Sequence, residues 1–472
     1  MNPEDFRRQG HALIDWIADY RAGVGDRPVR SPAAPGQVKA ALPPSAPEQP
    51  EPGEAVLADL DGLVAPVLTH WQHPSFFGWF PSNADLSSVL GDLASSGLGV
   101  LGLSWVASPA LTELEEVVVD WSRQLVGLSE AWRGVIQDTA STSTLVALLC
   151  ARERATGFAF GLGPPVAVYA SAHAHSSVRK AALLAGMRYR EIPVDADYAL
   201  LPDALADAMA RDAAEGVRPA AVVATTGTTT TTAVDPIQAT VDVALQHGAW
   251  VHVDAAMAGT AQILPEARWM WRGVEGADSI VWNAHKWLGV VFDCSLYFLR
   301  DPEHLTRVMS TNPSYLRTAV DDRVANLRDW GVPLGRRFRA LKLWYLLRTE
   351  GAERLRARIR RDLESAAWLA EQIRATPGWS VLAPVKLQTV CVRHTPPGLS
   401  GEALDRHTLA WAERLNASGA ALVTPAILDG AWMVRISVGS LTTEREHVAA
   451  LWERMREVVG CCCRSPQSAS FR

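Results

Sequence analysis

The chain has 472 residues, of which 48% are hydrophobic and 20% charged, and its formal net charge is −6. This length and composition predict a folded protein with a large core and more than one domain. The slight negative charge, without any basic block, argues against nucleic acid as a partner, and no apolar run is long enough to span a membrane.

The N-terminus is polar, so we expect no secretory signal and a cytoplasmic protein. Cys150, Cys294 and Cys391 lie in apolar segments, which is typical of reduced core thiols. No set of cysteines and histidines has the spacing of a zinc site, so we expect no metal. Residues 461–472, with three consecutive cysteines, are expected to form a disordered tail.

Residues 1–85 are expected to form an N-terminal helical arm and a connector. Apolar side chains at helical spacing predict an amphipathic helix over residues 4–22, and a second helix is expected over 53–69. Residues 28–53 are dense in proline, alanine and glycine, which predicts an extended connector. The pattern alone permits either wrapping around a partner subunit or packing on the chain's own domain.

Aromatic rings crowd the segment from Thr69 to Ser82. An apolar wall that ends in a polar hydroxyl can receive an aromatic ligand, although such a segment can also be plain core. The candidate substrate-binding residues in this segment are Trp71, Trp79, Phe80, Pro81 and Ser82.

Residues 86–343 are expected to form a large α/β domain. Strands predicted at 165–170, 220–224, 250–254 and 279–282 alternate with helical segments. Such alternation implies right-handed crossovers and a mostly parallel central sheet flanked by helices.

Small hydroxyl residues precede the helix predicted over 144–154. Backbone N–H groups and hydroxyls at a helix start can bind an anion, so Ala140 and Ser141 are candidates for such a site. A simple N-cap cluster without a ligand is the alternative.

Four chemically distinctive residues follow the carboxyl ends of predicted strands: His175, Thr228, Asp254 and Lys286. Open α/β sheets bind ligands at that edge, so we expect these residues to share one site. Lys286 lies just past a buried strand, where partial desolvation lowers the pKa of an amine and frees it to form a Schiff base. A surface lysine at a strand end is the alternative.

A polar stretch from Thr311 to Asp329 predicts a mobile loop. Helical patterns resume at 336–350 and 354–374. Strand and helix patterns then alternate, which predicts a small α+β C-terminal domain over 344–460.

Linked strings along the chain resemble the group II pyridoxal-phosphate-dependent decarboxylases, the aromatic-L-amino-acid decarboxylase family. The resemblance extends from Met1 to about residue 458 and includes the aromatic segment. Its other strings are Gln137–Ser141, Ala174–Ser177, Gly227–Thr230, His252–Ala256, Asn283–Leu288 and Leu334–Phe338.

The resemblance implies a fold-type I architecture, pyridoxal 5'-phosphate as cofactor and a homodimer. It assigns the Schiff base to Lys286, the pyridine-nitrogen partner to Asp254 and the ring stacking to His175. Further cofactor contacts fall on Ala140, Ser141, Thr228 and Asn283. Tyr315, in the predicted mobile loop, matches the family's catalytic tyrosine.

On the substrate side, the resemblance adds Leu101 and Leu103, with Leu103 reaching a neighbouring subunit's site. It also adds Gly335, because a glycine at this point of the family string accompanies larger rings. Departures from the family pattern at Trp79, Ser82, Met257 and Ala284 leave the preferred substrate open while removing no required group.

The leading hypothesis is decarboxylation of an aromatic L-amino acid to its amine, with tryptophan, 5-hydroxytryptophan, phenylalanine, tyrosine and DOPA all open. An aromatic aldehyde synthase is the nearest rival, and Tyr315 argues against it because aldehyde-forming relatives typically carry phenylalanine there. The glutamate or cysteine-sulfinate branch would require a cation where this chain has aromatic rings. A non-catalytic binding protein would have lost Lys286 or Asp254.

Overall fold

The computed structural model describes residues 1–311 and 318–460. The chain divides into two compact units: Met1–Pro81, Ser365–Ser380 and the part from Val392 onward form the first, and Ser82–Glu364 with Val381–Cys391 forms the second. Compactness does not show which parts fold independently. The domain boundaries expected near residues 85 and 343 therefore stay a prediction.

A seven-stranded sheet forms the centre of the second unit, in the order β1-β7-β6-β5-β4-β2-β3. All neighbouring strands are parallel except where β7 pairs with β1 and β6. The strands are β1 (Arg133–Gln137), β2 (Val166–Ser171), β3 (Arg188–Ile192), β4 (Arg218–Thr225), β5 (Trp250–Asp254), β6 (Ser279–Asn283) and β7 (Ser295–Leu299).

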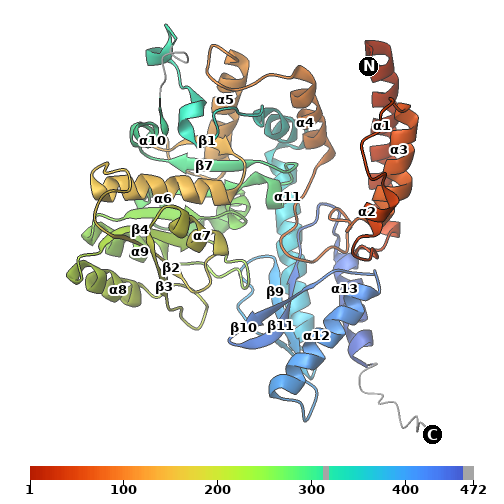
Figure 1. Ribbon diagram of the computed structural model, residues 1–472. Coiled ribbons are helices and arrows are strands. Elements are labelled where there is room, and N and C mark those ends of the chain that lie inside the picture. The colour runs from red at the N-terminus through yellow and green to blue at the C-terminus, as the bar shows by residue number, and fades with distance from the viewer. Residues whose placement is uncertain (312–317, 461–472) are drawn as a thin grey trace. The chain divides into compact units, whose positions relative to one another are not determined.

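Helices cover both faces of this sheet, and the strand order explains which face each takes. The connections β1-α6-β2 and β2-α7-β3 run in one direction along the sheet, whereas β3-α8-β4 and β4-α9-β5 run in the other. Because crossovers are right-handed, connections that run in opposite directions along the sheet place their helices on opposite faces. Accordingly α6 packs beside α7, and α8 beside α9 (Figure 1). These helices are α6 (Ala140–Thr156), α7 (Ser176–Leu184), α8 (Pro202–Ala214) and α9 (Ile237–Gln246).

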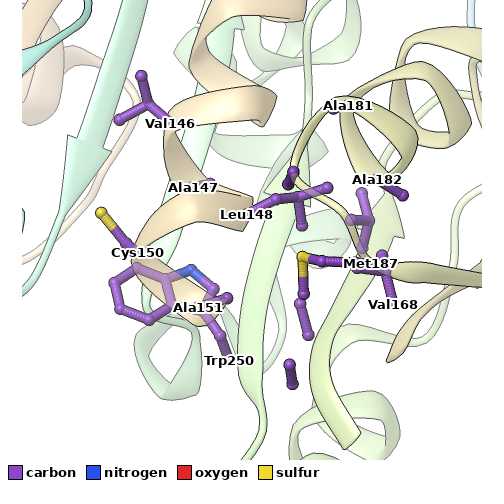
Figure 2. Packing of buried hydrophobic residues seen from close by; sticks show 14 of the residues in the cluster. Val146, Ala147, Leu148, Cys150, Ala151, Val168, Ala181, Ala182, Met187 and Trp250 are labelled. Atoms are coloured by element: carbon purple, nitrogen blue, oxygen red, sulfur yellow. The ribbon is translucent and has the colours of Figure 1, made fainter. Parts of the chain in front are cut away.

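The core on the α6 face is built from small and branched side chains. Ala147 and Ala151 of α6, together with Ala181 and Ala182 of α7, are buried and allow the two helices to approach closely (Figure 2). Met187 and Trp250 fill the space beside them. This packing fixes α6 on the sheet and therefore fixes where its first residues lie.

The remaining helices of the second unit are α4 (Leu86–Leu98), α5 (Pro109–Leu125), α10 (Pro302–Met309) and the first part of α11 (Ala340–Arg374). Two helical patterns were expected across the α11 region. The structure has two helical segments within Ala340–Arg374, which meet at Gly351, where a φ of 68° interrupts the helix and suits glycine. The helix begins at Ala340 rather than Arg336, because Arg336 is buried in an ion pair with Glu115.

The first unit contains α1 (Pro3–Ala22) beside α3 (Gly53–Asp59), and most of a sheet in the order β10-β11-β9-β8 packed against α12. Val381 of β8 and Thr389–Cys391 of β9 belong to the second unit. The connector expected to be extended contains a short helix, α2 (Gln37–Ala41), in a stretch that lacks proline. The C-terminal elements are β8 (Trp379–Val381), β9 (Thr389–His394), α12 (Gly401–Ala417), β10 (Thr424–Leu428), β11 (Ala431–Ser437) and α13 (Arg445–Gly460).

The polar stretch expected to be a mobile loop is packed in its later part. Asp321 accepts hydrogen bonds from the Thr318 amide (2.9 Å) and the Asn326 side chain (3.0 Å), and Leu327 is buried in the core. Residues 312–317, including Tyr315, lie outside the described residues, as does the 461–472 tail.

The α/β fold with a mostly parallel sheet, predicted from the alternation of strands and helices, is confirmed. Within residues 1–311 and 318–460, no helix combines the length and apolarity needed to cross a bilayer.

Candidate active site

The topology of the second unit brings the predicted cofactor residues to one edge of its sheet. Strands β2, β4, β5 and β6 run parallel, so their carboxyl ends meet there. Strand β1 pairs antiparallel with β7, which itself opposes β6, so β1 also ends at this edge. The start of α6 follows β1, His175 follows β2, and Asp254 and Asn283 are the last residues of β5 and β6.

Lys286 lies in the tight turn Ala284–Leu288 that follows β6. It is the one residue between Ser279 and Val290 that is not fully buried. Its backbone (φ −91°, ψ −107°) departs from the helical conformation of the turn around it. The preceding His285 is buried, and its Nδ1 lies 2.9 Å from both the carbonyl and the amide of Cys294. The turn therefore presents the lysine side chain while its neighbours are packed inside.

Asp254, His175 and Lys286 form one electrostatic cluster. Partial burial is the largest influence on the pKa of His175 and lowers it, while Asp254 raises that pKa and Lys286 lowers it. His175 caps the start of α7, where its Nδ1 accepts from the Ser177 amide at 3.2 Å. Burial therefore favours the neutral imidazole, and the helix start sets its position.

Asp254 is 4% exposed and accepts a hydrogen bond from the Ala256 amide at 3.0 Å. His252 lies two residues earlier on the same face of β5 and is fully buried, and this burial lowers its pKa to about 4. The two ring nitrogens of His252 lie 2.9 Å from Ser279 Oγ and 3.4 Å from Thr144 Oγ1. His252 thus connects β5, β6 and α6 directly beneath the edge that carries Asp254.

Thr228 lies in the loop after β4, and this loop is held by a second buried carboxylate. The Asp235 side chain accepts from the amides of Thr225 (2.7 Å) and Leu200 (2.8 Å), and burial raises its pKa to about 7. The Thr228 hydroxyl lies 3.1 Å from the Thr231 hydroxyl and accepts from the Ala233 amide. The loop is therefore ordered by its own contacts.

The residues at this edge fit the demands of pyridoxal phosphate. In the described part of the chain, Thr139 makes no side-chain capping bond at the start of α6, and Ser141 in the first turn is exposed, so the helix start can receive a phosphate. The buried Asn283 Oδ1 has no hydrogen-bond partner among the described residues. A buried carboxylate, a lysine and an open helix start together match a ring nitrogen, an aldehyde and a phosphate.

The aromatic segment belongs largely to the first unit. Trp71 stacks on Trp79 with ring centroids 5.3 Å apart, and both rings are exposed. Trp79 has a φ of 41°, and its amide donates to Thr424 Oγ1 at 2.8 Å. Arg435 lies over the Phe80 ring, 4.2 Å from its centroid, and also donates to the Trp79 carbonyl. Pro81 is buried and ends the first segment of this unit.

Ser82, Leu101, Leu103 and Gly335 belong to the second unit, and the last three lie on adjacent segments. The Gly102 amide donates to the Arg336 carbonyl at 2.9 Å. A Cβ atom at Gly335 would lie 3.3 Å from Leu101 Cδ1. Leu101 is 52% exposed. Leu101, Leu103 and Gly335 therefore form one open patch, and Gly335 keeps space beside Leu101.

Several residues that support the site were not found from the sequence. Asn83 is fully buried, and its side chain donates to the Lys286 carbonyl at 3.1 Å. Its place directly after the aromatic segment was the one available signal. Arg358 and Asp362 of α11 also contact the lysine turn, but they sit in a run of charged residues that reads as an ordinary solvated helix.

Comparisons with known proteins agree with this geometry. Residues 35–395 match the family model of the pyridoxal-dependent decarboxylase conserved domain. Phenylacetaldehyde synthase of Arabidopsis thaliana is 39% identical over 97% of this chain and 96% of its own. Aromatic-L-amino-acid decarboxylase of Bos taurus is 37% identical over 98% of both chains. The crystal structure of Oryza sativa TDC with PLP and tryptamine superposes with a TM-score of 0.95, at 37% identity over 98% of this chain and 99% of that one.

The family model spans most of the chain, and the relatives cover nearly all of it. The family, the cofactor and the enzyme class agree with those that the linked strings of the sequence predict. The chain belongs to the pyridoxal-dependent decarboxylases, carboxy-lyases that use pyridoxal 5'-phosphate.

Proposed function

We propose that this enzyme removes the carboxyl group of an aromatic L-amino acid and releases the corresponding amine and carbon dioxide. The observation that carries the proposal is the meeting of Asp254, His175 and Lys286 at the carboxyl edge of the sheet, where Asp254 raises and Lys286 lowers the pKa of His175. The aromatic composition of the segment from Thr69 to Ser82, which resembles the substrate-side loop of the family, supports an aromatic side chain in the substrate. We also propose a cytoplasmic location.

Pyridoxal phosphate, when bound, supplies a ring that accepts the electron pair left as carbon dioxide departs. Lys286 would hold the cofactor covalently through its amine. Asp254 would hold the proton on the ring nitrogen through opposite charge in a buried setting. The neutral imidazole of His175 would cover one face of the ring. The phosphate would be bound by Ala140 and Ser141 at the start of α6, and Thr228 and Asn283 would complete the contacts.

A substrate panel tests this proposal when carbon dioxide, amine and peroxide are all measured. We expect aromatic amino acids, indoles included, to give equal amounts of carbon dioxide and amine. Faster turnover of glutamate or histidine than of tryptophan, phenylalanine and DOPA would refute the aromatic substrate class.

An aldehyde synthase is the second candidate, because phenylacetaldehyde synthases stand among the relatives. That reaction consumes oxygen and releases aldehyde, ammonia and peroxide in place of the amine. Tyr315 favours the amine, and peroxide formed in step with carbon dioxide would favour the synthase.

We propose that the active unit is a homodimer. Leu86, Leu90 and Leu93 recur on one face of α4, and each is more than 40% exposed. In the first unit, Phe6 and Leu13 of α1 are also exposed. Apolar stripes of this kind are typical of surfaces covered by another chain.

Light scattering is expected to give twice the mass of one chain. Leu90→Glu should shift the protein toward monomer and reduce activity, because it places a charge in the apolar stripe. Leu245→Glu is the matched control, since Leu245 is 68% exposed on α9, away from the stripe. A fully active monomer of the unaltered protein would rule out the dimer.

Gly335→Ser is expected to lower kcat/KM for tryptophan relative to tyrosine by roughly tenfold, since small steric changes in an apolar pocket have effects of this size. The added side chain would crowd Leu101, which lies 3.3 Å from a Cβ at this position. Gly62→Ser is the control, because a Cβ there meets no described atom within 4 Å. Equal changes for both substrates would show that Gly335 does not set ring size.

A further inference from the structure

The turn that carries Lys286 is held by side chains from two distant segments. Three consecutive backbone carbonyls, those of Lys286, Trp287 and Leu288, each accept a side-chain hydrogen bond. Asn83 donates to the first at 3.1 Å, and Arg358 Nη2 donates to the second and third at 2.8 and 2.7 Å. Because Lys286 interrupts the helical conformation, these carbonyls need donors from outside the turn.

In addition to the hydrogen bond at its carbonyl, Trp287 makes one through its indole ring. Its Nε1 donates to Asp362 Oδ2 at 2.8 Å, and both side chains are 1% exposed. Arg358 and Asp362 are four residues apart on α11 and so lie on the same face of that helix. The residue immediately after the lysine is therefore attached to α11 by both its backbone and its side chain.

The charges of the two α11 residues support each other. Burial raises the pKa of Asp362 to about 6, and Arg358 is the strongest influence in the opposite direction. Burial is also the largest influence on the pKa of Arg358 and lowers it, whereas Asp362 raises it. Removing Arg358 would leave the Asp362 carboxylate, which is 1% exposed, with weaker compensation, and removing Asp362 would do the same to the partly buried Arg358.

We propose that Arg358 and Asp362 are positioning residues that fix the backbone of the Lys286 turn, so that the lysine amine stays within reach of the cofactor aldehyde. The inference rests on the proposed role of Lys286. Neither residue is a catalytic group, because each acts on the lysine through the backbone or through Trp287. Misplacement of a reacting group by about 1 Å can cost on the order of 100-fold in rate. Holding the backbone of the turn in place therefore affects how well the lysine amine reacts.

Retention of the covalent bond at Lys286 tests the inference without relying on turnover. Each full-length holoenzyme is diluted into buffer without cofactor, reduced with borohydride at intervals, and mapped for pyridoxyl label on Lys286. Arg358→Met is expected to lose label at least about tenfold faster than the parent. Arg356→Met is the matched control, because Arg356 lies on the same helix and donates to the Ile263 carbonyl at 2.9 Å.

Two milder variants keep the test decisive if Arg358→Met does not fold. Trp287→Phe keeps an aromatic ring but removes the N–H bond to Asp362, and should also lose label faster than the parent. Asp362→Asn keeps an oxygen acceptor for the indole and should retain label better than Asp362→Leu. If every one of these variants that folds holds label as long as the parent, the positioning role is wrong. If the parent itself carries no label on Lys286, the proposed function fails instead.

Discussion

Asp254→Asn is expected to remain folded and to bind pyridoxal 5'-phosphate, yet to lose roughly 10²–10³-fold in kcat, the cost typical of removing one preorganised electrostatic contact. Asparagine can still accept the hydrogen bond that the Ala256 amide now donates to Asp254 at 3.0 Å. It lacks the negative charge that would keep the ring nitrogen protonated. Steady-state kinetics, with visible absorption to report bound cofactor, would check this.

Asp278→Asn provides the control for losing a structural carboxylate. Asp278 lies at the opposite end of β6, where it pairs with Arg154 at 2.6 Å and accepts from the Val251 amide at 2.8 Å. Its replacement should lower the melting temperature while leaving the kcat of the folded fraction near that of the parent. Near-normal turnover in Asp254→Asn would contradict the proposed role of the buried carboxylate.

The sequence correctly predicted that the candidate site residues lie at the carboxyl edge of the sheet, but it did not predict all of the strands. His175, Asp254 and Lys286 could be placed together because each follows a buried strand, and parallel strands end at one edge. The antiparallel strand β7 was not predicted, since periodicity alone does not distinguish a short apolar run such as Ser295–Leu299 from a buried helix segment. The edge strand β3 was missed because its charged, partly exposed residues give a weak strand pattern.

Support for the lysine turn was hidden for a different reason. Arg358 and Asp362 reach the turn from α11, about seventy residues further along the chain. A charged pair four residues apart on a helix is normally a solvated surface feature. Their contacts with the turn depend on tertiary packing, which helical periodicity does not report. The same holds for Asn83, whose contact with the Lys286 carbonyl spans 203 positions of sequence.

Tyr315 determines the outcome of the reaction in our proposal. After carbon dioxide leaves, the substrate carbon holds an electron pair and must receive a proton. A phenol, with a pKa near 10, can deliver a proton to so basic a carbon. If protonation is slow, molecular oxygen can oxidise this carbon, and aldehyde, ammonia and hydrogen peroxide form instead of the amine. The described flanks are anchored: Ser310 bonds back to Thr306 of α10, and Thr318 to Asp321.

Tyr315→Phe is expected to bind cofactor normally but to form amine roughly 10²–10⁴-fold more slowly, the usual contribution of a positioned general acid. Carbon dioxide release should then be accompanied by oxygen consumption and by aldehyde, ammonia and peroxide in equal amounts. Amine chromatography and an oxygen electrode, run on the same samples, measure both outcomes. Tyr345→Phe is the control, because it removes a partly buried phenol from α11. Amine formation at the parent rate in Tyr315→Phe would show that another group protonates the substrate carbon, and the preference for amine over aldehyde would then need a different source.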